Sequence, residues 1–204
     1  MQASTCTEVD TLDDTKQRII DATMSLVRDK GYVATTTKDI AKLAHVNECT
    51  IFRKFNSKKD IILYAFQQEQ WNPNITPDIF QNLTWDLKTD LEMFMENYLE
   101  RVTADFVNLS IGLRAPQIYS ETSPLIMKIP EAFIKSLVSY FEQMYYKGKI
   151  QNNDFECMAM TIFSSTFGFT FLKASFGDKL SNVKQQDYIK KSVSLFVDGI
   201  LHVD

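Results

Sequence analysis

The side chains with the most suggestive chemistry lie between residues 47 and 59. The stretch begins with three polar residues, Asn47, Glu48 and Thr50. Two apolar residues, Ile51 and Phe55, are four positions apart. Four cations lie among and after them: Arg53, Lys54, Lys58 and Lys59. A helix that reads DNA needs small polar groups at its start for the base edges, an apolar underside, and flanking cations for the phosphates. The spacing therefore predicts a recognition helix over 48–55.

A second helix-start signal lies upstream, in a run of three threonines. Thr36 stands three residues before Asp39, an arrangement in which a hydroxyl and a carboxylate satisfy the free amides at a helix start. These amides and the helix dipole also favour an anion such as a phosphate. We therefore expect Thr36, Thr37 and Lys38 to contact DNA from the first turn of this helix.

The charge of the chain is unevenly distributed. The whole chain carries a net charge of -4, but residues 35–59 contain six basic groups and two acidic ones. This short stretch is suited to a polyanion although the whole chain is not. A run of charge is more often a solvated face, so the charge alone makes a nucleic-acid site the minority interpretation.

Catalytic and metal chemistry have few candidate residues. The two histidines, His45 and His202, have no cysteine, histidine or carboxylate at a metal-ligand spacing, and no glycine-rich phosphate loop or nucleophile elbow is present. Glu92, Glu96 and Glu100 share one helix face by spacing, which is typical of a solvated surface. The three cysteines lie far apart and indicate neither a disulfide framework nor a zinc site. We expect no enzyme activity, no metal and no cofactor.

The elements that must position these side chains are helical by pattern. Apolar residues recur at three- and four-residue spacing over 14–30, a short turn at 45–47 separates two small helices, and a further helix is expected over 58–71. Residues 72–83 form a linker, and the pattern beyond it is helical to the end. With only 6 glycines and 5 prolines, few turns are available. The sequence therefore predicts an all-α fold that contains a helix-turn-helix.

The hydropathy pattern favours a cytoplasmic protein without a membrane span. The longest apolar runs cover four to six residues, whereas a bilayer-spanning helix needs about 18–20. The first fifteen residues hold four acidic groups and no lysine or arginine, which is the opposite of a secretory signal.

One longer pattern runs through the predicted helix-turn-helix. It reads Gly31-Tyr32-x-x-Thr35-Thr36-x-Lys38-Asp39-Ile40-Ala41-x-x-Ala44-x-Val46-Asn47-x-x-Thr50-x-Phe52-x-x-Phe55-x-Ser57-Lys58. Residues 15–66 thereby resemble the N-terminal domain of the TetR family of bacterial transcriptional repressors. The resemblance implies a homodimer with a DNA-binding domain, which we place over 1–57. Within it we expect 1–14 to be a loose tail, because the first residues are acidic and precede the helical pattern. The resemblance also implies a ligand-binding and dimerisation domain over 58–204.

Several positions depart from the residues that are usual in the family. His45 stands for the turn glycine, Asn47 for serine, Cys49 for glycine, Phe52 for tyrosine and Lys54 for histidine. Phe52 keeps its place among the expected DNA contacts but lacks the hydroxyl that the family offers to a phosphate. We therefore expect the phosphate contacts to move toward Lys54 and Lys58, and Asn47 to cap the recognition helix.

The C-terminal region is interpreted from its own side chains. Its aromatic residues and methionines suit an apolar or aromatic effector, although each is more often core than pocket. The expected ligand-binding residues are Trp71, Trp85, Phe94, Tyr98, Phe106, Tyr119, Met127 and Phe133. The last two helices carry more apolar face than one subunit needs, which predicts a homodimer. The expected interface residues are Phe163, Phe167, Phe171, Tyr188, Val193, Phe196, Val197 and Ile200.

Together these patterns predict a transcriptional repressor that a small hydrophobic or aromatic effector releases from double-stranded operator DNA. Two alternatives stay open: a DNA-binding regulator without an effector, and a helical carrier or enzyme that retains a helix-turn-helix-like head. Salt-dependent binding to duplex DNA would exclude the second alternative. A ligand that stabilises the protein and also releases DNA would exclude the first.

Overall fold

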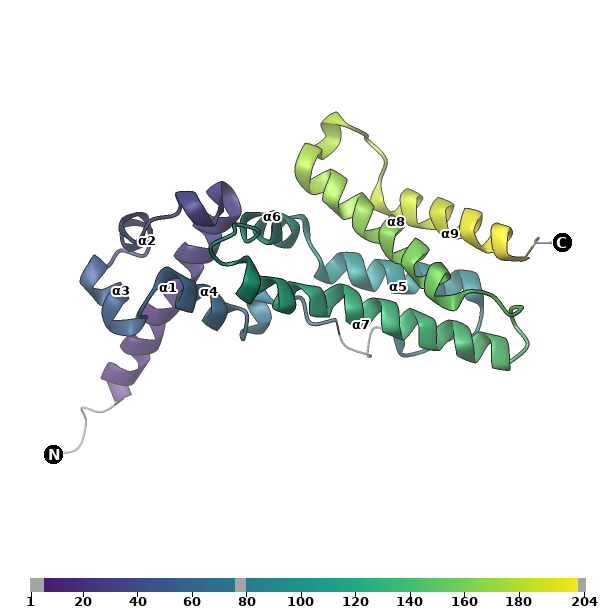
Figure 1. Ribbon diagram of the computed structural model, residues 1–204, viewed down its shortest axis with the longest axis horizontal. Helices are drawn as coiled ribbons and strands as arrows, with labels where there is room; N and C mark the ends of the chain where they lie inside the picture. Colours follow the sequence, from purple (N-terminus) through teal and green to yellow (C-terminus); the bar gives the residue numbers. More distant parts are fainter. Residues whose placement is uncertain (1–5, 76–79, 202–204) are drawn as a thin grey trace. The chain divides into compact units, whose positions relative to one another are not determined.

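The computed structural model describes residues 6–75 and 80–201, and these residues form helices joined by loops (Figure 1). The helices are α1 (Cys6–Ala34), α2 (Thr37–Leu43), α3 (Glu48–Lys54), α4 (Lys58–Ala65), α5 (Leu87–Arg101), α6 (Ala104–Gly112), α7 (Tyr119–Tyr146), α8 (Phe155–Phe176) and α9 (Gln185–Leu201). Two short 3-10 turns, Glu69–Trp71 and Gly177–Lys179, follow α4 and α8. The prediction of an all-α fold is confirmed.

α1 begins earlier than the sequence analysis expected. It starts at Cys6, so residues 6–14 are helical, and the prediction of a loose tail over 1–14 is wrong for this part. No glycine or proline lies between Cys6 and Lys30, so nothing in the sequence ends the helix there. Gly31, with φ at 80°, interrupts the regular helix directly after the helical pattern predicted over 14–30.

α4 ends earlier than expected, at Ala65 rather than near Trp71. The Asn72 side chain donates to the carbonyl of Phe66 over 3.2 Å and satisfies a free acceptor at this end. The chain then continues as a 3-10 turn and not as a longer α-helix.

The helices gather into two compact units. The first unit comprises Met1–Asn72 and Asn108–Leu125, and the second comprises Pro73–Val107 and Ile126–Asp204. α4, the end of α6 and the start of α7 therefore belong to the same unit as the helix-turn-helix, and the division does not fall at residue 57.

The first unit is held together by aliphatic side chains. α1 packs against α2 and α4, and α2 packs against α3. The fully buried residues include Ile19, Met24, Val27, Ile40, Ile51, Ile61 and Ile62. Removal of this apolar surface from water stabilises the arrangement and fixes the position of α3 relative to α1 and α2.

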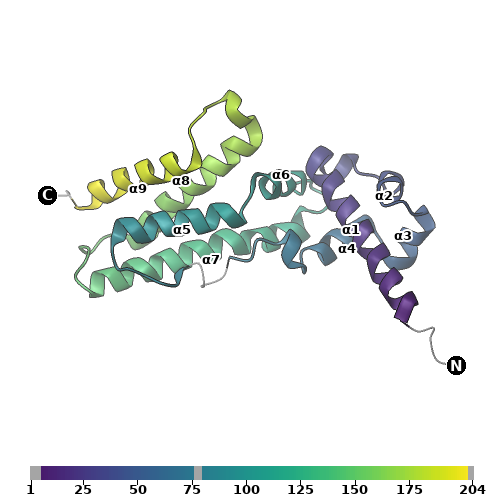
Figure 2. The ribbon, with the colours of Figure 1, turned by 180° about the vertical axis from the view of Figure 1, so that it is seen from behind.

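The second unit has an aromatic core. α5, α7, α8 and α9 lie side by side in both views (Figures 1 and 2). Two ring pairs join α5 to α7: the centroids of Phe94 and Tyr140 are 5.0 Å apart, and those of Tyr98 and Phe133 are 4.7 Å apart. Offset and edge contacts of this kind add to the energy of simple burial.

A buried carboxylate fastens the segment before α5 to α7. Asp90 accepts hydrogen bonds from the amide and hydroxyl of Thr84, from the amide of Trp85, and from the hydroxyl of Tyr140, all at 2.7–2.9 Å. Four donors satisfy a charge that would otherwise be costly to bury. Burial and the bond to Asp90 raise the pKa of Tyr140 above its ordinary value.

α8 is notable for its length and low polarity. Among the described residues, one stretch, Phe155–Lys179, is long and apolar enough to cross a membrane by length and composition. Serine, threonine and glycine interrupt its apolar runs, which is why run length alone did not identify it. Core helices of globular proteins pass the same test, and α8 packs Met158, Ala159 and Ile162 into the core of the second unit.

Candidate DNA interface

The start of α2 is fixed by the capping pair that the sequence predicts. The Asp39 amide donates to Thr36 Oγ1 over 3.1 Å, and the Thr36 amide donates to Asp39 Oδ2 over 3.4 Å. Lys30 Nζ lies 2.7 Å from the same carboxylate oxygen. Hydrogen bonds from Lys30 and Thr36 lower the pKa of Asp39 to about 2. The carboxylate is therefore charged at neutral pH and holds the first turn of α2.

Thr37 and Glu48 connect the two helices of the motif. The Thr37 hydroxyl donates a hydrogen bond to Glu48 Oε1. Because Thr37 opens α2 and Glu48 opens α3, this bond sets the two helix starts side by side. Both were predicted as DNA contacts, and in the structure they contact each other.

Asn47 lies at the N-cap position of α3, but its side chain makes no capping hydrogen bond. The prediction that its side chain caps the helix is therefore wrong. The backbone closes the turn instead, because the Asn47 carbonyl accepts from the Thr50 amide over 2.8 Å. The exposed Asn47 amide group is left facing solvent at the start of the recognition helix.

α3 has a buried face and an exposed face. Ile51 and Phe55 are buried as predicted, and the Phe55 ring meets the edge of Tyr64 of α4 at 5.9 Å. The other side presents a set of exposed residues: Asn47, Glu48, Cys49, Phe52 and Arg53. Thr50 and Lys54 are half-buried beside them. The apolar side chains of α3 thus hold the helix against the rest of the first unit, and its polar and cationic side chains point toward solvent.

The turn between α2 and α3 has a strained residue. His45 has φ at 53°, in the left-handed region that favours glycine. The turn is closed by the Val46 amide, which donates to the Ala41 carbonyl over 3.0 Å. Arg18 of α1 also donates to the Ala44 carbonyl at 3.0 Å. These contacts hold His45 in a conformation that a histidine adopts at some cost.

Lys58, predicted as a phosphate contact, has partners inside the first unit. Its ammonium donates to the carbonyls of Tyr32 and Thr35 and lies 4.0 Å from the centre of the Tyr32 ring. Burial, and then the nearby Lys30, lower the pKa of Lys58. The side chain therefore fastens the end of α1 and the loop before α2 to the start of α4.

Lys59, the next residue, is also paired. Its Nζ lies 2.9 Å from Glu121 Oε1 in the first turn of α7. The bond to Glu121 raises the pKa of Lys59, and hydrogen bonds from Ser120 and Lys59 lower the pKa of Glu121. Sequence reasoning placed Lys59 among the flanking cations and missed this pairing, because its partner is 62 residues away.

The residues predicted to bind an effector do not gather around one cavity. Five of them fill or flank the aromatic core of the second unit: Trp85, Phe94, Tyr98, Phe106 and Phe133. Trp71 and Tyr119 belong to the first unit, and Met127 is exposed on α7. Aromatic residues at helical spacing can pack in a core or line a pocket, and most of the residues predicted to bind an effector pack in or against the core.

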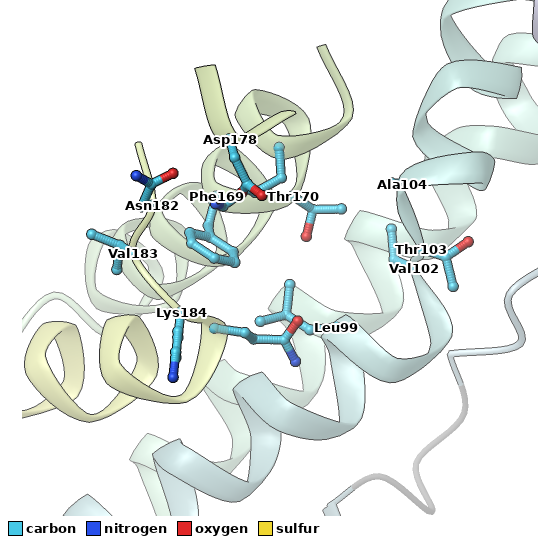
Figure 3. Close-up of a pocket in the computed structure, with 12 residues that line it drawn as sticks. Leu99, Val102, Thr103, Ala104, Phe169, Thr170, Asp178, Asn182, Val183 and Lys184 are labelled. Atoms are coloured by element: carbon cyan, nitrogen blue, oxygen red, sulfur yellow. Dashed lines mark hydrogen bonds and ion pairs between the residues drawn. The ribbon is translucent and has the colours of Figure 1, made fainter. Parts of the chain in front are cut away.

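A hollow of about 510 Å³ lies within the second unit, beneath the loop that joins α8 to α9 (Figure 3). Leu99 of α5, Val102 directly after that helix, Phe169 and Thr170 of α8, and Asn182 of the loop line it. No predicted ligand-binding residue is among the residues that line it. Most of its lining is small or polar, so it has no aromatic pattern that could be found in the sequence.

The predicted dimer residues are buried in the core of the second unit or half-buried against it. Val193 and Val197 are buried, and the Phe196 ring packs 6.2 Å from Phe141 inside the subunit. The other five are half-buried beside the core: Phe163, Phe167, Phe171, Tyr188 and Ile200. Three large apolar residues that were not predicted are exposed on the same helices: Met160 and Leu172 of α8 and Leu195 of α9.

Known proteins share both the sequence and the fold. The family model described as bacterial regulatory proteins, tetR family, matches residues 19–65. The chain is 32% identical over 186 residues to the HTH-type transcriptional regulator YvkB of Bacillus subtilis (strain 168), covering 91% of this chain and 97% of that protein. It is 25% identical over 182 residues to IcaR of Staphylococcus aureus (strain Newman), the biofilm operon icaADBC HTH-type negative transcriptional regulator, covering 83% and 89%. The fatty acid degradation regulator FadR from Bacillus halodurans has a similar fold, with a TM-score of 0.68 and 20% identity over 93% of this chain and 97% of that one.

Proposed function

This chain belongs to the TetR family of bacterial transcriptional regulators, and we propose that it represses transcription as a homodimer that a small hydrophobic or aromatic effector releases from its operator. Its sequence relatives are transcriptional regulators and not enzymes. One observation carries the proposal. The outer face of α3 exposes polar and cationic side chains, while Ile51 and Phe55 hold the helix from below.

The side chains of this face divide by chemistry. We assign base contacts to Asn47 and Thr50, and contact with a thymine methyl to Phe52, because these groups match what base edges offer in the major groove. The phosphate contacts are assigned to Thr36, Lys38, Arg53 and Lys54. Lys58 is assigned a positioning role, because its ammonium already contacts two carbonyls. Thr37 and Glu48 position each other.

The two compact units suggest a division of labour. We assign DNA binding to the first unit, which contains α2, α3 and α4, and effector binding and dimerisation to the second. The protein would work in the cytoplasm, where its DNA target is found.

The exposed sides of α8 and α9 support the homodimer. Met160, Ser164 and Leu172 lie on the exposed side of α8, and Leu195 lies on the exposed side of α9. A small apolar hollow of about 310 Å³ has walls from both helices, including Ser164, Leu172 and Tyr188. The two exposed sides therefore adjoin each other, and a second copy would cover them.

The test uses the full chain and a pool of random DNA duplexes. Selection and sequencing should give a site with two related half-sites, as a dimer requires. Binding of this duplex, measured by fluorescence anisotropy, should weaken steeply with salt. Thr50→Ala should cost about 1–3 kcal/mol on the selected site and little on an unrelated duplex. Failure to enrich any sequence would refute the proposal.

A further inference from the structure

We propose that the hollow beneath the α8–α9 loop is the effector site and that its ligand is an uncharged aromatic compound bearing hydroxyl or carbonyl groups. The inference rests on the repressor function proposed above. The hollow, at about 510 Å³, has the volume of a small-molecule site. All of its walls belong to the second unit, so it exists within one compact body.

One wall of the hollow offers a surface for an aromatic ring. Phe169 projects from α8 toward Leu99 of α5 (Figure 3). Tyr188 of α9 stacks against the Phe169 ring, with centroids 4.4 Å apart and planes within 18°. The Tyr188 hydroxyl is fixed in turn by Ser165, at 2.8 Å from its Oγ. The Phe169 ring is therefore held in place before a ligand arrives, which lowers the entropy lost on binding.

The polar groups around this ring are mostly uncharged. Thr103, Thr170, Asn182 and Gln185 all line the hollow, and they provide hydroxyl and amide groups from α8, α9 and the two connections α5–α6 and α8–α9. Thr170 is buried, so its hydroxyl is well shielded from bulk water. A few converging donors and acceptors beside an apolar wall are typical of a site that orients a ligand by hydrogen bonds.

Of the three charged residues that line the hollow, Lys173 and Asp178 pair with each other, and the Lys173 ammonium lies 6.0 Å from the centre of the Phe169 ring. Lys173 Nζ lies 2.8 Å from Asp178 Oδ1 and donates to the Ser181 carbonyl over 2.7 Å. Lys184 directs its side chain away from the Phe169 ring (Figure 3). A charged ligand at the Phe169 ring would lose part of its hydration and would find Lys173 and Asp178 already paired with each other, and this disfavours both anions and cations at the ring.

Other spaces in the second unit suit an effector less well. The aromatic core is filled by its own side chains, with Phe94 and Phe133 fully buried. The smaller apolar hollow includes Ser164 and Leu172, which lie on the side of α8 assigned to the dimer. The hollow beneath the α8–α9 loop is the one that combines an aromatic wall, hydrogen-bonding groups and adequate volume.

The experiment titrates the full chain with quercetin, a flat polyhydroxylated aromatic, by calorimetry. Phe169→Leu removes the stacking surface and Thr170→Val removes a hydroxyl at constant volume. We expect each to weaken quercetin binding about tenfold. The matched control is Phe155→Leu, another half-buried phenylalanine of α8, which lies outside the hollow and next to Tyr145. It should bind quercetin like the unaltered chain.

The same variants are tested for binding to the selected duplex, which separates the two proposals. Phe169→Leu and Thr170→Val should bind DNA as the unaltered chain does but resist release by quercetin. Equal quercetin binding by all variants would overturn the location. Release of DNA by dodecanoate or rhodamine 6G, with no effect of quercetin, would overturn the chemical class and leave the repressor function intact. Absence of DNA binding by the unaltered chain would refute the repressor function itself.

Discussion

Gly112 lies so close to the backbone of α1 that a Cβ atom at this position would stand 2.4 Å from the carbonyl oxygen of Val27. The same atom would lie 3.4 Å from the Cα atom of Gly31. Only a residue without a side chain permits this approach of two helices. The contact explains how the end of α6 joins the compact unit that contains the helix-turn-helix.

Gly112→Ala should therefore destabilise the protein. The carbonyl of Val27 belongs to the backbone of α1 and cannot move aside without shifting that helix, so we expect a loss on the order of 1–3 kcal/mol in the free energy of unfolding. Urea denaturation followed by circular dichroism measures it. Asn108→Ala, one turn upstream, adds no atom and should change stability little. An unchanged midpoint for Gly112→Ala would mean that α6 and α1 separate easily.

His45→Gly should have the opposite effect. The φ of 53° at His45 strains any residue with a side chain, and glycine removes the strain. We expect a gain of about 1 kcal/mol in the free energy of unfolding. His45→Val should lose stability, because a β-branched residue tolerates this conformation least. If glycine and valine both lower the urea midpoint, the imidazole itself makes a stabilising contact.

Acid should weaken the start of α2 at an unusually low pH. The pKa of Asp39 is about 2 in the folded protein, against an ordinary value of 3.8. A carboxyl group whose pKa is lowered by folding contributes stability that is complete above its unfolded pKa and is lost as the pH falls through the folded pKa. At about pH 6, Asp39→Asn should therefore have a lower thermal midpoint than the unaltered chain. The difference between the two midpoints should be smaller near pH 2. In Lys30→Met, the loss of stability in acid should occur at a higher pH. If the thermal midpoint of Lys30→Met depends on pH as that of the unaltered chain does, Lys30 does not lower the pKa of Asp39.

Interactions between neighbouring residues were predictable from the sequence. The Thr36–Asp39 pair, the interruption of α1 at Gly31 and the buried Ile51–Phe55 face each depend on residues within one or two helical turns. Local spacing determines such features, so a pattern reveals them. Asn47 is at the N-cap position as predicted, but its predicted side-chain hydrogen bond is absent, because a backbone hydrogen bond closes the turn instead.

Interactions between distant residues were not predictable. Lys58 meets the Tyr32 carbonyl 26 residues away, and Lys59 meets Glu121 62 residues away. Nothing in the local sequence distinguishes these two lysines from a cation that faces DNA. For a similar reason, the sequence could not tell which aromatic residues of the C-terminal region pack in the core and which line a pocket, since both kinds of site are built from the same residue types.

Arg53 and Lys58 should behave differently when their charge is removed. Arg53 is exposed on α3, so Arg53→Ala should weaken binding to the selected duplex and to unrelated DNA alike, and should lower the salt slope by about one. Lys58→Met should lower the thermal midpoint, because two carbonyls lose their donor, but should leave the salt slope unchanged. Anisotropy titrations at several salt concentrations measure both slopes. A reduced slope for Lys58→Met would restore Lys58 as a phosphate contact.

Leu195→Glu should separate the dimer without unfolding the subunit. Leu195 is 75% exposed, while α9 turns Ile189, Val193 and Val197 toward the core, so the leucine buries little surface within one chain. Phe196 is a less informative site, because it packs inside the subunit against Phe141. In sedimentation, the unaltered chain should have twice the 23.6 kDa mass of one subunit, and Leu195→Glu should have the mass of one subunit. Leu195→Glu should also bind the operator more weakly, because two half-sites need two associated subunits. Tyr146→Glu, at a position 83% exposed at the end of α7, is the control and should remain dimeric. A Leu195→Glu protein that still sediments as a dimer would place the interface elsewhere.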